Sequence, residues 1–288
     1  MRATTSAILK RIYRLTQAVS RHAVDAHLER HIVEDFIQGE YGAPYGISRR
    51  ERARLVEGMR AVLEHVPSAT RLLYHIVLAR ELLSLAPESQ GDVVECGAFK
   101  GASSASLSLT CALARRRLWI CDSFAGLPDG EGEITRDYPH LKVQGRYAAG
   151  MYAGSLAEVK HNVGAYGAID TCQFLPGLFA ESLQTLPPRL VFAFVDVDLA
   201  SSLRDCIRHI WPRLVDEALI YTDDSCDLEV VRVWFDDAWW RAELGERSPG
   251  YVGSGCGLPM SVGGSSLGYA RKVADVRRSY QRVPWLAS

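Results

Sequence analysis

The sequence lacks an excess of charge of either sign. Its 33 Lys and Arg residues balance 34 Asp and Glu residues, which gives a formal net charge of −1 at pH 7. A chain balanced in this way lacks the excess of positive charge that attracts the phosphate backbone of DNA or RNA. We therefore expect no nucleic-acid partner.

The cysteines lack any Cys-x-x-Cys pair. There are seven of them, an odd number, and they are scattered along the chain. Neither a zinc site nor a disulfide framework is indicated by such spacing. Several lie within apolar runs, where buried free thiols in a reducing cytosol are the expected state.

The sequence also lacks an unbroken apolar run long enough to span a bilayer. It has no recognisable signal peptide and no internal repeat. These absences favour a soluble, cytoplasmic protein without a membrane partner.

What is present is enough apolar sequence for a substantial core. The chain has 288 residues, of which 48% are hydrophobic. Such a length accommodates one large α/β domain with accessory helices, or at most two domains. We expect an N-terminal helical extension and lid over residues 1–88, a main domain over 89–275 and a C-terminal tail over 276–288.

The first 38 residues have helical periodicity. Ile8, Ile12, Leu15 and Val19 recur at steps of three and four, with basic residues between them. One interpretation is a basic amphipathic anchor for a membrane surface. The other is an accessory helix that packs on the fold or on a second subunit, and the shortness of the basic face favours it.

A turn-rich break follows at Gly39–Gly46, which predicts either a mobile lid or a simple connector. Ser48 then caps a helix, with Glu51 three residues later as its capping-box partner. A further helix is expected over about 68–86, where apolar residues recur on one side.

After Pro87 the pattern changes to strands that alternate with helices, which is typical of a parallel sheet built from βαβ units. The predicted strands are 92–96, 117–122, 172–176, 190–196 and 218–222. The predicted helices between them are about 102–114, 155–166, 178–184 and 200–213. Tyr251-Val252 and Gly268–Ala270 suit a closing antiparallel hairpin.

The stretch from Val93 to Ser104 is typical of a parallel strand that delivers a ligand to a helix N-terminus. An apolar run ends in Glu95, passes Gly97 and Gly101, and enters a helix rich in serine. Glycine allows close backbone approach, and the exposed N–H groups face the ligand. The spacing is not that of dinucleotide or phosphate-cradling loops. Because Glu95 would repel a phosphate, a cationic or hydroxyl-rich ligand suits the stretch better.

Carboxylates follow three other predicted strands. In doubly wound sheets the ligand lies at the carboxyl ends of the strands, so these side chains should converge there. Like charges at such proximity need a cation or partial protonation, and oxygen ligands suit Mg²⁺, Mn²⁺ or Ca²⁺. The alternative for any one of them is a helix cap, as Asp198 could provide for the helix near Leu199. The residues concerned are Asp122, Asp196, Asp198, Asp223 and Asp224.

These segments together resemble the macrocin O-methyltransferase family, whose members methylate sugar hydroxyls in antibiotic biosynthesis. The string Asp-Ser-Phe-Ala-Gly-Leu-Pro, from Asp122 to Pro128, is the most specific piece. Glu95–Ser104, Phe174–Phe179 and the two aspartate pairs fall in the family's order and spacing. Tyr45–Arg52 resembles its N-terminal lid. The similarity covers roughly residues 40–240.

The resemblance implies a Rossmann-like class I methyltransferase fold, with a seven-stranded, mostly parallel sheet. It also implies that S-adenosylmethionine binds at the first two strand ends, with Glu95 holding its methionine part and Asp122 its ribose. The residues implied in cofactor binding are Glu95, Gly97, Ala98, Phe99, Gly101, Ser103, Ser104, Asp122, Ser123, Phe124, Gly177 and Phe179.

A divalent ion, Mg²⁺ or another such as Mn²⁺ or Ca²⁺, is implied at Asp196, Asp223 and Asp224. It would lower the pKa of an acceptor hydroxyl and align it with the methyl group. Asp196 is the first choice for the proton acceptor and Asp198 the second. The implied acceptor is a small polyhydroxy molecule with a diol, such as a sugar of a natural product, and a homodimer or higher homo-oligomer is expected.

The sequence departs from the family beside these aspartates. Val197 stands where the sugar enzymes tend to have glycine, and Leu199–Ser202 replaces their Tyr-Glu-Ser run. The resemblance therefore does not indicate how the wall of the acceptor pocket is built. Trp234, Phe235 and the pair Trp239-Trp240 either form part of it or pack in the core, and their helical spacing favours the core.

Two alternatives from other classes remain. Asp196-Val197-Asp198 after an apolar strand could be the Asp-x-Asp motif of a metal-dependent glycosyltransferase. A non-catalytic subunit that keeps the methyltransferase fold is the second alternative.

Overall fold

The computed structural model describes residues 29–129, 136–138, 143–145, 147–223, 225, 227–253 and 267–273. Residues 1–28 and 274–288, which contain most of the predicted N-terminal helix and the whole C-terminal tail, lie outside this part of the chain. Within it, no helix combines the length and the hydropathy needed to cross a bilayer.

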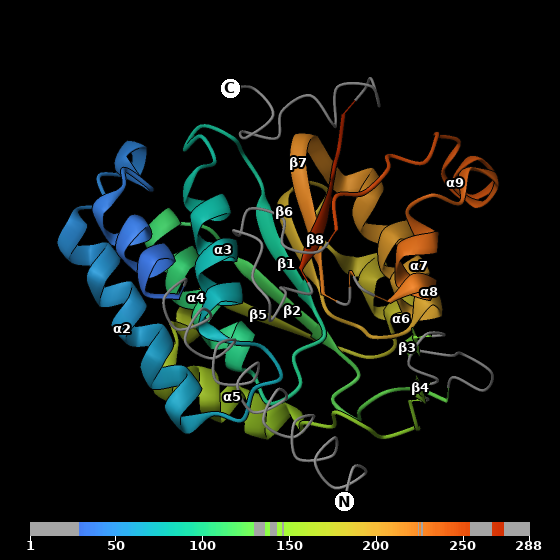
Figure 1. The fold of residues 1–288 in the computed structure, drawn as a ribbon, viewed down its shortest axis with the longest axis horizontal. Coiled ribbons are helices and arrows are strands. Elements are labelled where there is room, and N and C mark those ends of the chain that lie inside the picture. Colours follow the sequence, from blue (N-terminus) through green and yellow to red (C-terminus); the bar gives the residue numbers. More distant parts are fainter. Residues whose placement is uncertain are drawn as a thin grey trace, which may run out of the picture.

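A six-stranded sheet forms the centre of the described structure (Figure 1). Its strand order is β5-β2-β1-β6-β7-β8, and all neighbours are parallel except β7 and β8. The strands are β1 (Asp92–Cys96), β2 (Leu118–Asp122), β5 (Cys172–Pro176), β6 (Leu190–Val195), β7 (Leu214–Thr222) and β8 (Gly268–Arg271). A separate antiparallel pair consists of β3 (Arg136–Tyr138) and β4 (Val143–Gly145).

Helices cover both faces of the sheet, as the two sides of Figure 1 show. On one face lie α3 (Leu72–Leu83), α4 (Ala102–Ala114) and α5 (Leu156–Tyr166), with α2 (Arg49–His65) and the helix of residues 29–38 packed outside them. On the other face lie α6 (Phe179–Ser182), α7 (Ala200–Ile210), α8 (Leu228–Val233) and α9 (Asp237–Leu244). The sheet is thus enclosed in a Rossmann-like, doubly wound α/β fold.

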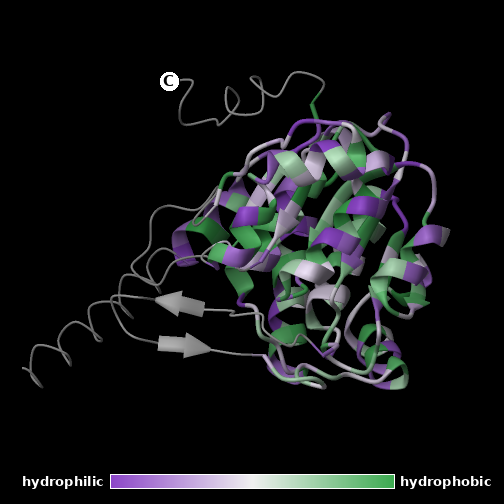
Figure 2. Cartoon of the chain, turned by 90° about the vertical axis from the view of Figure 1, so that its right-hand side faces the viewer, coloured by the Kyte–Doolittle hydropathy of each residue, from purple (hydrophilic) through white to green (hydrophobic). Residues whose placement is uncertain are grey.

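Burial on both faces explains why the central strands read as continuous apolar runs. Every residue of β6 is buried, and so are four of the five residues of β1. Their apolar side chains divide between two separate clusters, one under α3–α5 and one under α7–α9. Figure 2 shows hydrophobic segments running through the interior. This is the pattern that parallel sheets require.

The predicted elements agree closely with the observed ones. Strands 92–96 and 172–176 and helix 102–114 have the predicted bounds, and the closing antiparallel element is confirmed by β8 and by a bridge from Val252 to Tyr269. Strand β7 begins four residues before the predicted 218, and α7 ends at Ile210, after which residues 211–213 form a 3-10 turn. Seven strands were expected in the sheet, whereas the described residues supply six.

The break at Gly39–Gly46 is a connector in this structure. Ala43–Tyr45 form one 3-10 turn, and the Tyr45 hydroxyl accepts a hydrogen bond from Arg116 at 2.9 Å. Arg116 precedes β2, so this contact lies at the amino ends of the strands. The lid that the resemblance implies for Tyr45–Arg52 is therefore not at the ligand-binding edge of the sheet. The capping box of Ser48 and Glu51 is confirmed.

Three tryptophans pack together in the core. Trp211, Trp234 and Trp240 are buried, with ring centroids 4.9–6.5 Å apart. The Trp240 indole N–H donates to the Val233 carbonyl at 2.8 Å, which ties α9 to α8. Core packing is therefore the correct interpretation for Trp234 and Trp240, whereas Phe235 is largely exposed.

Replacing Trp240 by alanine should lower the free energy of unfolding by about 3–5 kcal/mol, because it leaves a cavity among buried aromatic rings. Urea unfolding followed by circular dichroism measures the change. Phe235→Ala, on an exposed ring, serves as the matched control and should change stability by less than about 0.5 kcal/mol. Equal effects in both variants would contradict the packing described here.

Candidate active site

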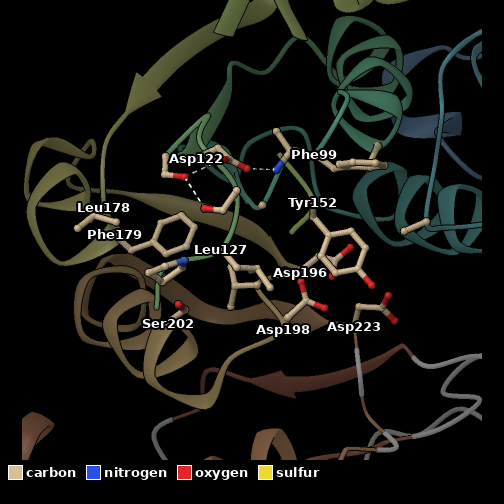
Figure 3. A pocket seen from close by; sticks show the side chains of 18 of the residues that line it. Phe99, Asp122, Leu127, Tyr152, Leu178, Phe179, Asp196, Asp198, Ser202 and Asp223 are labelled. Carbon is tan, nitrogen blue, oxygen red and sulfur yellow. Dashed lines mark hydrogen bonds between the residues drawn. The ribbon is translucent and has the colours of Figure 1, made fainter. Parts of the chain in front are cut away.

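A cavity of about 570 Å³ opens at the carboxyl ends of the strands. The first residues after five neighbouring strands line it, and further walls come from residues 67–74, 126–129, Tyr152 and the start of α7 (Figure 3). Its size is in the range of small-molecule sites. It lies at the point where the strand order reverses between β1 and β6, which is where doubly wound sheets bind ligands.

The sheet's hydrogen-bond ladder runs one residue beyond the strands and aligns the residues at their tips. Gly177 N donates to Asp122 O at 3.0 Å, and Gly97 N donates to Cys121 O at 3.0 Å. On the other side of β1, Asp196 N donates to Cys96 O at 2.9 Å, and Asp223 N to Val195 O at 3.2 Å. The floor of the cavity is consequently a single row of fixed backbone.

Gly97 is required at the centre of this row. Its φ is +90°, and a Cβ at this position would lie 1.8 Å from the Asp196 carbonyl oxygen. Only glycine allows β1 and β6 to approach so closely at their ends. Because of this close approach, the loop of Gly97–Gly101, called the glycine loop below, and the loop of Asp196–Asp198 line the same cavity from two sides.

Asp122 holds the glycine loop in place. Its Oδ2 accepts from Ala98 N at 2.7 Å, and its Oδ1 accepts from Phe124 N at 2.7 Å. Burial raises the pKa of its carboxyl group, although these backbone N–H bonds oppose the rise. Carboxylate oxygens have further lone pairs, so a ligand hydroxyl can be accepted in addition.

The string that follows Asp122 is a tightly bonded turn. Ser123 Oγ donates to Gly126 O at 2.9 Å and accepts from Ala125 N at 3.1 Å. Gly126 has a φ of +86°, and a Cβ there would lie 2.6 Å from the Met151 carbonyl oxygen. Residues 126–129 and Tyr152 are thereby packed together at the rim of the cavity.

Glu95 lies below this floor and does not line the cavity. It has 0% exposure, and its carboxyl accepts a hydrogen bond from the Ser104 hydroxyl. Burial raises its pKa to about 7, although the hydroxyls of Ser103 and Ser104 oppose the rise. Ser103, next to Ser104, does line the cavity. The methionine contact implied for Glu95 is thus not direct in this structure, and its influence would be electrostatic.

Three of the predicted acidic residues gather on one side of the cavity: Asp196, Asp198 and Asp223 all line it, with Tyr152 beside them (Figure 3). The N-cap residue of α7 is Leu199, which makes no side-chain cap. Asp198 has a φ of +58°. Asp224 lies outside the described residues. Among the described residues, no group of three or more His, Cys, Asp or Glu side chains is arranged to hold a metal ion.

The predicted cofactor residues divide into two groups. Those that line the cavity are Gly97, Ala98, Phe99, Ser103, Asp122, Ser123, Gly177 and Phe179. The others do not line it but belong to the same loops and elements; they are Glu95, Gly101, Ser104 and Phe124. Gly101, for example, is the N-cap of α4 with a φ of +88°, and a Cβ there would lie 3.0 Å from Val159 Cγ1.

Several lining residues lie outside every motif that the sequence analysis identified. They belong to the connection between α2 and α3, to the first turn of α3, to the segment after β4 and to α7, and they are Ser68, Thr70, Tyr74, Tyr152 and Asp205. Leu127, Ser201 and Ser202 also line the cavity, and they belong to segments that the sequence analysis noted without assigning these residues to the site. Only the tertiary fold brings them to the strand ends.

Comparison with known proteins gives a family match. The family model described as Macrocin-O-methyltransferase (TylF) matches residues 81–245, which include every strand-end residue of the cavity. This match covers more than half of the chain.

Two relatives are similar over a shorter span. One is an 8-demethyl-8-(2,3-dimethoxy-alpha-L-rhamnosyl)-tetracenomycin-C 4'-O-methyltransferase of Streptomyces olivaceus, which is 31% identical over 49% of this chain and 55% of its own length. The other is a demethyldecarbamoylnovobiocin O-methyltransferase of Streptomyces niveus, 31% identical over 46% of this chain and 52% of its own length. The chain spans about half the length of these relatives.

Solved structures are also similar. The O-methyltransferase NovP has a TM-score of 0.48 and 20% identity, covering 79% of this chain and 81% of that one. The calicheamicin methyltransferase CalS11 has a TM-score of 0.46 and 15% identity, covering 77% and 92%.

The pKa of Glu95 predicts a pH-dependent stability. Because the folded protein keeps the proton up to about pH 7 while the unfolded chain releases it near pH 4.5, stability falls as the pH rises between these values. In Glu95→Gln this fall should be smaller by about 2–3 kcal/mol between pH 5 and pH 8. Urea unfolding at both pH values measures it. Glu181→Gln, at an exposed site, should keep the wild-type profile; parallel profiles for all three proteins would contradict the burial of an ionisable Glu95.

Proposed function

The chain belongs to the macrocin-O-methyltransferase family, and from this premise we propose that it transfers a methyl group from S-adenosylmethionine to a hydroxyl of a small, diol-bearing molecule with the help of a divalent ion. The proposal rests on one observation above all: the residues matched by the family model include the strand-end residues that line the cavity. Residues 97, 122, 177, 196 and 223 all fall within the matched range.

The cavity suits the methyl donor in charge and in shape. S-adenosylmethionine supplies its methyl group on a positively charged sulfur, which becomes neutral once the methyl group leaves. Acidic side chains at Asp122 and Asp196 favour such a cation over an anion. The backbone of Gly97–Phe99 offers close approach, and Leu178 and Phe179 provide apolar surface for a purine ring.

The acidic side of the cavity suits a hard divalent cation in its chemistry. Asp196 and Asp223 provide carboxylate oxygens, which Mg²⁺, Mn²⁺ and Ca²⁺ prefer. Asp224, the third predicted ligand, follows Asp223 directly. Such an ion would stabilise negative charge on an acceptor oxygen.

The residues of the chain have three tasks in the proposed reaction. The glycine loop and Asp122 orient the donor, and the acidic side orients the acceptor hydroxyl. Asp196, or Asp198 as the second choice, takes the hydroxyl proton as the oxygen lone pair forms the new C–O bond. The S–C bond breaks at the same time and its electron pair stays on sulfur, so no acid is needed for the leaving group.

We propose that the acceptor is a sugar of a natural product. The support comes from the two relatives, whose names describe O-methylation of a rhamnosyl tetracenomycin and of a novobiocin precursor. Assembly as a homodimer or higher homo-oligomer stays a prediction of the resemblance, as does a cytoplasmic location.

The family match decides against the Asp-x-Asp glycosyltransferase, because the matched model describes methyltransferases. An assay of methyl transfer distinguishes an active methyltransferase from a non-catalytic subunit with the same fold. It would bind S-adenosylhomocysteine without transferring methyl groups to any acceptor.

Calorimetry with S-adenosylhomocysteine tests donor binding, and we expect a dissociation constant in the micromolar range or below. A screen with radiolabelled S-adenosylmethionine and Mg²⁺ over deoxysugar glycosides, phenolic diols and hydroxylated peptides should then label a glycoside. Binding of a sugar nucleotide in place of S-adenosylhomocysteine would refute the proposal. Binding without labelling of any acceptor would favour the non-catalytic alternative.

Asp223→Ala should lower turnover at least about 100-fold, because it removes a group that stabilises developing charge. Affinity for S-adenosylhomocysteine should stay within about twofold of the wild type, since the donor lies on the other side of the row. Steady-state kinetics and calorimetry measure the two effects.

The control for this variant is Asp216→Ala, at the opposite end of β7 and exposed, which should change neither property. Full activity of Asp223→Ala, or of the wild type in excess chelator, would show that the proposed metal site is not used.

A further inference from the structure

A buried histidine connects two walls of the cavity. His75 Nε2 lies 2.8 Å from the Thr70 hydroxyl, and His75 Nδ1 lies 2.6 Å from the Ser106 hydroxyl. Thr70 lines the cavity and Ser106 belongs to α4. His75 itself, on α3, does not line the cavity. The ring therefore bridges the connection before α3 and the helix that follows the glycine loop.

Each end of this bridge is fixed further. Ser68 Oγ donates to Thr70 O at 2.9 Å and accepts from Thr70 N at 3.1 Å, which closes a tight turn in the wall. At the other end, the Ser106 carbonyl accepts from the Thr110 hydroxyl at 3.1 Å. The polar chain thus runs from the cavity surface at Ser68 into the interior of α4.

Burial keeps the His75 ring neutral at neutral pH. It is 2% exposed, and burial lowers its pKa to about 4. A neutral imidazole has one nitrogen that donates and one that accepts. Both nitrogens have a hydroxyl partner, so the buried ring is fully satisfied and has one preferred orientation.

The bridge acts on residues that face the ligand. Ser106 lies one helical turn beyond Ser103, and residues spaced by three positions share a helix face. Ser103 and Ala102 line the cavity together with Pro67–Thr70 and Tyr74. A shift of the wall relative to α4 would therefore change the width of the cavity where the glycine loop enters the helix.

We propose that His75 is a positioning residue, whose two ring nitrogens hold the Pro67–Thr70 wall against α4 and so preorganise the donor side of the cavity. The inference rests on the proposed function, in that the ligand positioned is S-adenosylmethionine. His75 touches no ligand. It acts through Thr70, and a misplaced wall reduces affinity because part of the binding free energy is then spent on ordering it.

Two conservative variants separate the two halves of the bridge. The amide of asparagine reaches the position of Nδ1, so His75→Asn keeps a partner for Ser106 and loses the one for Thr70. The amide of glutamine reaches the position of Nε2, so His75→Gln keeps the contact to Thr70 and loses the one to Ser106. His75→Gln leaves the buried Ser106 hydroxyl without its histidine partner, and His75→Asn leaves the Thr70 hydroxyl with Ser68 Oγ alone, 3.1 Å away. Both variants should lose stability.

Calorimetry with S-adenosylhomocysteine and urea unfolding are measured on each full-length variant. We expect His75→Asn and His75→Gln each to weaken S-adenosylhomocysteine binding about tenfold, because each variant detaches one end of the bridge. His161→Asn, at an exposed histidine of α5, should leave affinity and stability unchanged, and Trp240→Ala, which lowers stability on the other face of the sheet, should keep the wild-type affinity. Wild-type affinity in either His75 variant, or an equal loss of affinity in Trp240→Ala, would overturn the proposal.

Thr70→Val provides an independent check that leaves the core histidine in place. It removes the hydroxyl that His75 holds, and it should weaken binding about as much as His75→Asn. The double variant should then bind no more weakly than either single one, since both changes break the same contact. Additive losses would show that the residues act separately. A wild-type protein that does not bind S-adenosylhomocysteine at all would instead refute the proposed function itself.

Discussion

The backbone hydrogen bonds that extend the parallel ladder one residue past the strand ends are the constraint on which the site depends. They link Gly177, Asp122, Gly97, Asp196 and Asp223 into one row across five strands. The row closes at its centre because Gly97 has no Cβ to collide with the Asp196 carbonyl. Residues that are distant in sequence acquire fixed mutual positions from the sheet itself, whereas loops alone would leave them mobile.

With this floor, one cavity can orient the methyl donor on one side and accept a proton and bind a cation on the other. The side at Gly97 and Asp122 is mostly backbone N–H groups and a carboxylate already bonded to them, which suits orientation of a donor. The side at Asp196, Asp198 and Asp223 concentrates negative charge, which suits proton acceptance and cation binding. Buried polar groups support the donor side from behind. Glu95 lies under the glycine loop, and His75 ties the outer wall to α4.

The sequence predicted those parts of the fold that local physics determines. Apolar runs gave the strands within a few residues, because buried parallel strands have no polar face, and the glycines and aspartates at their ends gave the floor of the cavity. The walls at Thr70 and Tyr152 were not predicted, because their place depends on how loops pack in three dimensions. Glu95 shows the converse case. Its position in the motif is right, but the side chain points beneath the floor, since the period of two in a strand decides which face it takes.

A crystal structure of the protein with S-adenosylhomocysteine and Mg²⁺ tests the account most directly. We predict the nucleoside against Gly97–Phe99, with its ribose at Asp122, and the ion between Asp196 and Asp223, on the other side of the same row. Density for the ligand outside this cavity, or for the ion away from these two aspartates, would contradict the division into a donor side and an acidic acceptor side.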